Sequence, residues 1–391
     1  MRLYISSYSS DCACFKCQYD ITLDVLNRLV SLMTEVKDVA FVIPFVPKKA
    51  SGGVLVIFQY AEKLVELGNK VTLYFQANDA LKKLKIPMFV RKQITKYRLT
   101  YAPENWYPLN NKIKKVAITT LKDIKKHDAI IATGIRTSFL VKKLPSEYGK
   151  KFYFIQDYEN WDGFTDNDVL NSYRLGLDNI VISDWLSKIV EDASGKRPKL
   201  IKDGIDTELF KVTRSLEQRK THSVVFQYRS DSEPFKGGKY ALEVVKKLKD
   251  EYPDLDAKIV SREQKSSEIP NWCEYLYNLP LKDVVVADNQ ALVFICTSIE
   301  EGFGLPGLEA MACGCVLCTT DYRGGREYAV HRQNAMVSPV KDVDAMVDNI
   351  SEVFDDKELR DKLSINGIKT ANEMSLKKSR DEFANYVLGK I

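Results

Sequence analysis

The most informative stretch of the sequence is VFICTSIEEGFGLPGLEAMACGCVLCTT, residues 293–320. An apolar run of strand length leads into a glycine-containing loop at 301–305, and Pro306 suits the first turn of a helix that continues to Cys313. Gly314 ends this helix at a position that favours positive φ, and a second apolar run follows. A strand, a glycine loop and a helix amino terminus together present backbone N–H groups and a positive dipole end to an anion. The stretch therefore predicts an anion site.

Two glutamates flank this loop, with seven residues between them. Glu301 opens the loop and Glu309 lies on the first turns of the helix. Two carboxylates beside an anion site can accept hydrogen bonds from the hydroxyls of a sugar or a ribose while the N–H groups hold phosphate. The alternative is structural: Glu301 caps a helix and Glu309 is a solvated helix residue.

Two further elements upstream have the composition of ligand-binding loops. In FQYRSDSEPFKGG, residues 226–238, Arg229 follows a strand and Lys236 precedes a glycine pair, which suits a diphosphate. Taken alone, these cations also fit ordinary surface charges. At Ser51-Gly52-Gly53, between a strand and a helix, Gly53 allows a ligand to approach the backbone, although a simple turn has the same composition.

Strand and helix patterns alternate along most of the chain, which predicts parallel sheets covered by helices. Two such sets flank residues 202–210, so we expect an α/β protein with two doubly wound, Rossmann-like domains that face a central cleft. The expected boundaries are an amino-terminal arm at 1–35, a first domain at 36–202 and a second domain at 203–375. The last helix, within 376–391, is expected to pack back on the first domain.

Composition excludes several classes of protein. The chain has 391 residues with 45% hydrophobic and 28% charged residues, as expected for a globular protein. Its net charge of +5 is too small to indicate a nucleic-acid partner. The longest apolar runs, such as residues 39–46, are too short to span a membrane, and residues 1–20 lack the apolar core of a signal peptide, so a cytoplasmic address is expected. The eight cysteines and three histidines do not have the spacing of a metal site.

Charge is distributed unevenly between the two halves. Residues 51–150 contain 19 Lys/Arg and 7 Asp/Glu, whereas residues 251–350 contain 8 and 16. The stretches 81–98 and 112–126 mix cations with apolar side chains, so an anionic membrane surface at the inner face of the membrane is a further expected partner. Ordinary solvated helices are the alternative.

Together these elements resemble the retaining GT-B glycosyltransferases of family 4 over residues 39–390. The family's marker is the glutamate pair, here Glu301 and Glu309 in EGFGLPGLE. The Gly52-Gly53 loop, the cations Arg229 and Lys236, GGREY at 324–328 and KDGIDTELF at 202–210 agree with the resemblance. Asp203 departs from it, because many relatives have Asn there.

The resemblance implies a role for each residue of the donor site. Glu301 is expected to contact the hydroxyls of the donor sugar near the reacting carbon, and Glu309 those of the ribose. Arg229 and Lys236 are expected to neutralise the diphosphate leaving group, so that no divalent metal and no cofactor other than the nucleotide-sugar donor is needed. The backbone from Gly302 through Phe303 and Gly304 to Leu305 is expected to hold the sugar and phosphate.

On the acceptor side, the sequence departs from the family. Many relatives have a histidine after a strand of the first domain, where this chain has Gln156, Asp157, Tyr158 and Glu159. This QDYE run resembles bacterial rhamnosyltransferases of surface glycan synthesis, which implies a donor such as dTDP-L-rhamnose. Asp157 is then expected to orient or deprotonate the acceptor hydroxyl. Alternatively, Asp157 and Glu159 cap the next helix.

The resemblance thus implies retaining transfer of a sugar to a hydroxyl of a glycan or of a lipid-linked acceptor. Two alternatives remain at this stage. One is a phosphorylase or epimerase of the same architecture, and the other is a catalytically silent subunit that binds a sugar nucleotide.

Overall fold

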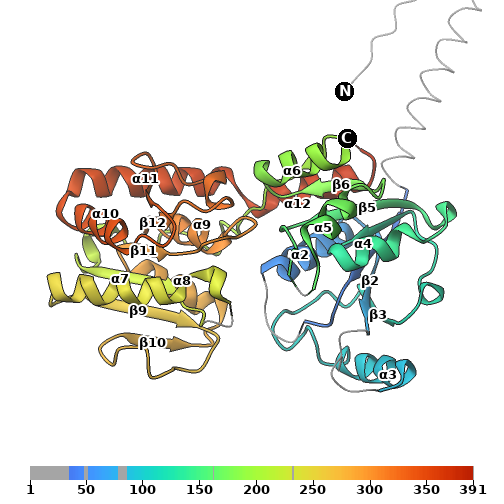
Figure 1. Cartoon of the computed structure of the whole chain (residues 1–391), viewed down its shortest axis with the longest axis horizontal. Helices are drawn as coiled ribbons and strands as arrows, with labels where there is room; N and C mark the ends of the chain where they lie inside the picture. Colours follow the sequence, from blue (N-terminus) through green and yellow to red (C-terminus); the bar gives the residue numbers. More distant parts are fainter. Residues whose placement is uncertain (1–34, 48–51, 78–85, 162, 231–232, 391) are drawn as a thin grey trace, which may run out of the picture.

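The computed structural model describes residues 35–47, 52–77, 86–161, 163–230 and 233–390. Two α/β domains lie side by side, the first mostly blue to green and the second yellow to red in Figure 1. Each is built on one parallel sheet, which confirms the expected fold class. The expected arm at 1–35 lies almost entirely outside the described residues, as does Ser51.

The first domain contains a seven-stranded sheet in the order β3-β2-β1-β4-β5-β6-β7. All of its pairings are parallel, and its central strands are mostly apolar and buried because helices cover both faces. Its strands are β1 (Asp38–Ile43), β2 (Lys70–Gln76), β3 (Lys114–Ile118), β4 (Ala129–Ala132), β5 (Lys150–Ile155), β6 (Asp178–Val181) and β7 (Lys199–Leu200).

The second domain has a six-stranded parallel sheet in the order β10-β9-β8-β11-β12-β13. In both domains the order reverses direction beside the first strand, which is where parallel α/β sheets form their ligand crevice. The strands are β8 (Ser223–Gln227), β9 (Asp256–Ser261), β10 (Glu274–Tyr277), β11 (Val293–Cys296), β12 (Val316–Thr320) and β13 (Ala335–Ser338).

The helices cover the sheets with apolar stripes whose spacing matches the helical repeat. In α2 the buried positions include Val54, Ile57, Phe58, Ala61 and Leu64. The helices of the first domain are α2 (Gly52–Glu66), α3 (Met88–Arg98), α4 (Ile135–Lys142), α5 (Asp166–Tyr173) and α6 (Asp184–Ser194). Those that follow are α7 (Gly238–Glu251), α8 (Leu281–Gln290), α9 (Leu305–Ala312), α10 (Val343–Asp355), α11 (Lys357–Glu373) and α12 (Leu376–Val387).

The chain crosses between the domains twice, and the two crossings touch. Ile205 donates a backbone hydrogen bond to Met374 and accepts one from Leu376. A Cβ on Gly204 would lie 2.5 Å from the Ser375 backbone, so the contact requires glycine. Beyond this point α12 packs on the first domain (Figure 1). Its Phe383 lies against Tyr60, with ring centroids 4.3 Å apart.

One expectation about local structure is wrong. The basic segment 112–126 is not a helix: it contains edge strand β3 and a short 3₁₀ turn at Leu121–Asp123. Lys114 of β3 is exposed at the edge of the sheet, where cations are common because they discourage pairing with another chain. Lys115 is partly buried and pairs with Glu104. The other basic segment does contain a helix, α3, although residues 81–85 lie outside the described residues.

Candidate active site

A single cleft of about 2250 Å³ separates the two domains and is lined by the carboxyl ends of both sheets. All of the residues that sequence analysis assigned to a site line this cleft. They are Gly53, Gln156, Asp157, Tyr158, Glu159, Arg229, Lys236, Glu301, Gly302, Phe303, Gly304, Leu305 and Glu309. The fold thus brings together groups that lie up to 256 positions apart in the sequence.

The glycine loop takes the expected path between β11 and α9. Gly304 has φ +94° and precedes the first residue of the helix, so α9 directs its amino terminus at the cleft. Two buried tyrosines support the loop: Tyr328 donates a hydrogen bond of 2.6 Å to the Gly304 carbonyl, and its hydroxyl lies 3.0 Å from that of Tyr322. A Cβ on Gly304 would lie 2.0 Å from the Tyr322 hydroxyl, so only glycine fits.

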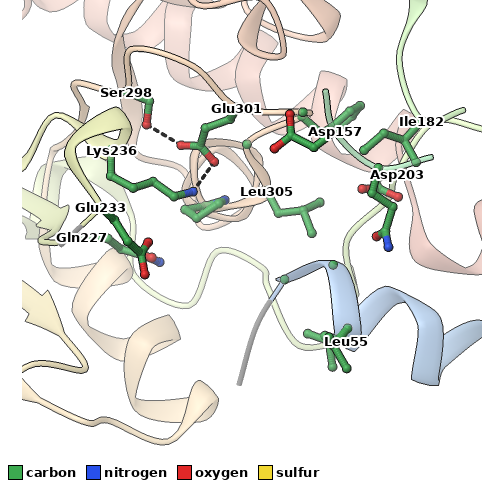
Figure 2. Close-up of a pocket in the computed structure, with 18 of the residues that line it drawn as sticks. Leu55, Asp157, Ile182, Asp203, Gln227, Glu233, Lys236, Ser298, Glu301 and Leu305 are labelled. Carbon is green, nitrogen blue, oxygen red and sulfur yellow. Dashed lines mark hydrogen bonds and ion pairs between the residues drawn. The ribbon is translucent and has the colours of Figure 1, made fainter. Parts of the chain in front are cut away.

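Glu301 and Lys236 form an ion pair across the donor side of the cleft, as Figure 2 shows. The Lys236 Nζ lies 2.6 Å from Glu301 Oε2, and Ser298 donates to the other carboxylate oxygen. Burial favours the neutral amine of Lys236, but the adjacent Glu301 carboxylate outweighs it and raises the pKa of Lys236 above its ordinary value. Lys236 is therefore charged at neutral pH, and the ion pair holds both side chains in place.

The loop that carries Lys236 is fixed by close backbone contacts. Gly237 has φ +68°, and a Cβ there would lie 1.9 Å from the Thr297 carbonyl. A Cβ on Gly238 would lie 2.0 Å from the Arg229 carbonyl. These two glycines pack the Lys236 loop against the ends of β8 and β11, which explains the glycine pair that the sequence analysis noted.

Glu309 and two arginines form a second charged group in the same cleft. Burial raises the pKa of Glu309 to about 7, and the nearby Arg262 partly opposes this shift. Arg262, which follows β9, is also close enough to Arg229 for the two cations to influence one another. The donor side thus presents the cations Arg229, Lys236 and Arg262. Carboxylates lie among them: Glu233, 3.9 Å from Arg229 Nε, lines the same side together with Glu263, Glu301 and Glu309. Cations beside a helix amino terminus suit a ligand with two phosphates.

The first domain presents the segment after β5 to the donor loop. Asp157 lies near Glu301 (Figure 2), and burial together with that carboxylate raises the pKa of Asp157 to about 6. A Cβ on Gly302 would lie 2.0 Å from the Gln156 carbonyl, so the backbones of the two domains meet here. The Gln156 side chain lies beside Gly53, at 3.2 Å from where a Cβ would be.

Glu159 has a structural contact as well as a position in the cleft. Its carboxylate accepts a hydrogen bond of 2.6 Å from the Ile135 backbone N–H, so it caps α4 at the end of β4. Burial raises the pKa of Glu159 to about 7. This agrees in part with the structural alternative, although the capped helix precedes Glu159 in the chain instead of following it. Tyr158 lies half-buried along the same wall.

Contacts between the domains extend beyond the reacting groups. Trp185, at the start of α6, donates a hydrogen bond of 3.0 Å to the Gly302 carbonyl. Arg323 forms a two-point ion pair with Glu300 and lies over the Trp185 ring. Glu327 accepts from the Asp184 backbone N–H and pairs with Lys202 at 2.8 Å. The segment GGREY therefore contributes to closure between the domains.

Sequence analysis missed several of these groups. Neither Arg262 nor Trp185 belongs to a sequence motif. Each can be assigned to the site only when the order of the strands in the sheets is known. A usable signal did exist in the loop itself, because residues 302–307 spell G-x-G-x-x-G, the spacing of dinucleotide-binding turns. That spacing, which follows a strand and opens a helix, independently indicates a phosphate site.

Among the described residues, no group of three His, Cys, Asp or Glu side chains is arranged to hold a metal ion. The described helices include none with the length and apolar character needed to cross a bilayer.

Comparison with known proteins agrees with this geometry. Residues 212–370, the core of the second domain, match the family model described as "Glycosyl transferases group 1". The whole fold matches the crystal structure of Anabaena Alr3699/HepE in complex with UDP, with a TM-score of 0.70 and 15% identity over 91% of this chain and 100% of that one. The fold is GT-B, as expected.

Curated relatives match parts of the chain in sequence. EpsD of Bacillus subtilis strain 168 is 25% identical over 236 residues, which are 55% of this chain. O-antigen chain mannosyltransferase B of Escherichia coli is 32% identical over 104 residues, 27% of this chain. The matched part of the chain spans 61% of the length of EpsD and 27% of that of the mannosyltransferase.

Proposed function

We propose that the protein is a retaining glycosyltransferase that moves a sugar from a nucleotide-diphosphate donor to a hydroxyl of an acceptor glycan. The observation that carries this proposal is the Glu301–Lys236 pair, which lies at the phosphate-binding loop of the second domain and faces Asp157 of the first. A carboxylate for sugar hydroxyls, cations for a diphosphate and an acidic group on the opposite domain are what the reaction requires. The match of residues 212–370 to group 1 glycosyltransferases supports the same proposal.

The donor has one orientation that uses all of these groups. Its diphosphate lies between Lys236, Arg229 and the amino terminus of α9, where helix dipole and cations add. The ribose hydroxyls reach Glu309, and the sugar turns back toward Glu301. Arg262 and the backbone around Asn278, which also line the cleft, then flank the nucleobase. No metal is required, because cationic side chains take the charge of the leaving group.

The proposed chemistry is a front-face substitution. The bond between the anomeric carbon and the phosphate oxygen breaks, and the nucleoside diphosphate leaves with both bonding electrons. The acceptor oxygen bonds to the same face of the carbon, and its proton passes to the departing phosphate oxygen. Asp157 orients the acceptor hydroxyl. Contact of the Gly302 and Gln156 backbones excludes water from the reacting carbon.

We propose a hexose as the sugar transferred, with dTDP-L-rhamnose as the first donor to test, because the QDYE run at 156–159 resembles rhamnosyltransferases. A thermal-shift screen should compare dTDP-L-rhamnose, UDP-glucose and GDP-mannose. We expect one of these to raise the melting temperature by several degrees more than its free sugar does. The products then separate the alternatives: slow hydrolysis to sugar and nucleoside diphosphate fits a transferase, whereas sugar 1-phosphate formed from inorganic phosphate fits a phosphorylase. A chain that binds the donor and never turns it over would be a silent subunit.

We also propose that α3 holds the protein against an anionic membrane surface, so that a lipid-linked acceptor can reach the cleft. Phe89 on α3 is 71% exposed, Met88 and Tyr97 are exposed beside it, and the helix carries four Lys/Arg and no acidic residue. The chain that follows α3 lines the cleft at Asn105. Cations with exposed aromatic side chains are typical of interfacial helices.

Liposome flotation tests this surface. We expect the protein to float with vesicles that contain phosphatidylglycerol and not with pure phosphatidylcholine. Phe89→Ser should reduce the bound fraction severalfold, because it removes the largest exposed apolar side chain of α3. Ile365→Ser, at a 66% exposed position of α11 in the other domain, serves as the control and should bind as the wild type does. Equal flotation of both variants, or none by the wild type, would end the membrane proposal.

A further inference from the structure

Exposed aromatic side chains line both walls of the cleft: Phe45 and Trp161 on the first domain, and Phe235 and Tyr277 on the second. Trp161 is 52% exposed and Phe45 is 42% exposed, and both line the cleft. Large apolar side chains normally lose water contact on folding, so two exposed aromatic rings that face a cleft indicate a ligand. The half-buried Tyr158 and Phe164 line the same wall.

The topology brings these rings to one place. Phe45 follows β1 and Trp161 follows β5, and both flank the end of β4, which lies between those strands in the sheet. At that end, Gly134 has Pro44 on one side and Glu159 on the other: a Cβ there would lie 3.7 Å from a Pro44 carbon and 3.3 Å from the Glu159 carboxylate. The segment that carries Phe45 and the segment that carries Trp161 therefore both approach Gly134.

Polar groups surround the rings. Asn160 donates a hydrogen bond of 3.1 Å to Asp166, and both are exposed to the cleft. Arg136 lies over the Phe164 ring, with its guanidinium carbon 5.3 Å from the centroid. An aromatic face beside an amide, a carboxylate and a guanidinium matches the chemistry of a sugar ring, whose C–H face is apolar and whose edge carries hydroxyls.

The charge of this wall distinguishes between kinds of acceptor. Asp157, Glu159 and Asp166 line it, with Arg136 as the only Lys or Arg that the described lining places on the same strand ends. A phosphate at this wall would face three carboxyl groups, whereas a neutral hexose would not be repelled. The first-domain wall and the cluster of Arg229, Lys236 and Arg262 on the donor wall therefore suit different ligands.

We propose that Trp161 stacks on the terminal pyranose ring of the acceptor, so that the group accepting the new sugar is itself an uncharged hexopyranoside. This inference rests on the proposed glycosyltransfer and deepens it by naming the chemical class of the acceptor. Phe45 forms the second aromatic contact with this ring, and Asn160 and Asp166 form hydrogen bonds with its hydroxyls. The accepting hydroxyl then lies beside Asp157, across from Glu301.

The experiment compares acceptors with and without a ring. With the donor selected by the thermal-shift screen, transfer is measured to octyl hexopyranosides and to octyl glycerol, a diol of similar chain length. We expect transfer to at least one pyranoside and a kcat/KM at least tenfold lower for octyl glycerol. Transfer to both at equal rates would overturn the inference. Transfer to neither, with donor hydrolysis intact, would overturn it and leave the proposed function standing, whereas a chain that neither binds nor hydrolyses any donor would contradict the proposed function itself.

Variants of Trp161 test whether this side chain causes the preference for a pyranoside acceptor. Trp161→Ala should raise the KM for the pyranoside tenfold or more with a smaller change in kcat, and Trp161→Phe should restore most of the affinity because it keeps a flat ring. Trp272→Ala is the matched control, since Trp272 is 40% exposed and lies outside the cleft lining. If Trp161→Ala and Trp272→Ala behave alike, or if Trp161→Phe is no better than the alanine variant, Trp161 has no stacking role.

Discussion

Replacing Glu301 with Gln is expected to lower turnover on the order of 10³-fold while the protein stays folded. The substitution keeps the shape of the side chain and removes the charge that faces Lys236 at 2.6 Å. In the proposed mechanism, the Glu301 carboxylate stabilises the positive character that the sugar ring gains as its bond to phosphate breaks, and removing one such electrostatic contact typically costs about 10²- to 10³-fold. Steady-state kinetics with the identified donor measure the effect.

The neighbouring residue provides the control. Glu300 precedes Glu301 in the chain, but it pairs with Arg323 instead of Lys236. Glu300→Gln should therefore change turnover less than about fivefold, an effect the size of a lost surface ion pair. Thermal unfolding of both variants separates a catalytic loss from a folding defect. A Glu301→Gln enzyme that is as active as Glu300→Gln would remove Glu301 from the mechanism.

Replacing Asp203 with Asn is expected to stabilise the protein at neutral and alkaline pH. Asp203 follows β7 at the crossing between domains; it is 4% exposed, and its Oδ1 has no hydrogen-bond partner within the part of the chain that is described. Burial raises the pKa of Asp203 from 3.8 to about 7. A buried carboxyl without a partner favours its neutral form, so ionisation at high pH opposes folding.

The sign of the pH dependence follows from this shift. The stabilising contribution of the protonated Asp203 is complete below its pKa in the unfolded chain, near 4, and is lost as pH rises through about 7. At about 1.4 kcal/mol for each pKa unit, a shift of about three units corresponds to a loss on the order of 4 kcal/mol. The amide of Asn does not ionise. The gain in free energy of unfolding from Asp203→Asn should therefore grow from near zero at pH 4 to as much as this value at pH 8.

Urea denaturation at a series of pH values checks this expectation. Asp250→Asn, at an exposed position of α7, is the control for the same substitution outside the buried crossing. An Asp203→Asn difference that is constant between pH 4 and pH 8 would mean that Asp203 ionises as freely in the folded protein as in the unfolded chain.

Local patterns predicted the donor half of the site well. From residues 293–320 alone, the strand, the glycine loop, the start of α9 and the placement of Glu301 could be read, because each depends on residues close in sequence. The two-domain architecture also followed from the alternation of strands and helices. Such features need only the spacing of apolar residues and the special conformations of Gly and Pro.

Features that depend on distant neighbours could not be predicted in this way. The lysines of β3 give it the composition of an exposed helix, and only its pairing with β2 makes it a strand. Arg262 lines the cleft because β9, which precedes it, lies next to β8 in the sheet. The contact of Gly302 with Gln156 joins residues from two domains, so no local pattern describes it. The complete site therefore depends on contacts between residues that are distant in sequence as well as on these local patterns.

Calorimetric titration with the nucleotide sugar selected by the screen is the most direct test of the central claim, which is that the cations of the second domain bind its diphosphate. The account predicts one site in the wild type and at least a hundredfold weaker binding in Arg229→Ala/Lys236→Ala. Lys239→Ala, an exposed lysine three residues away that does not line the cleft, should bind like the wild type. Undiminished affinity in the double variant would contradict the account.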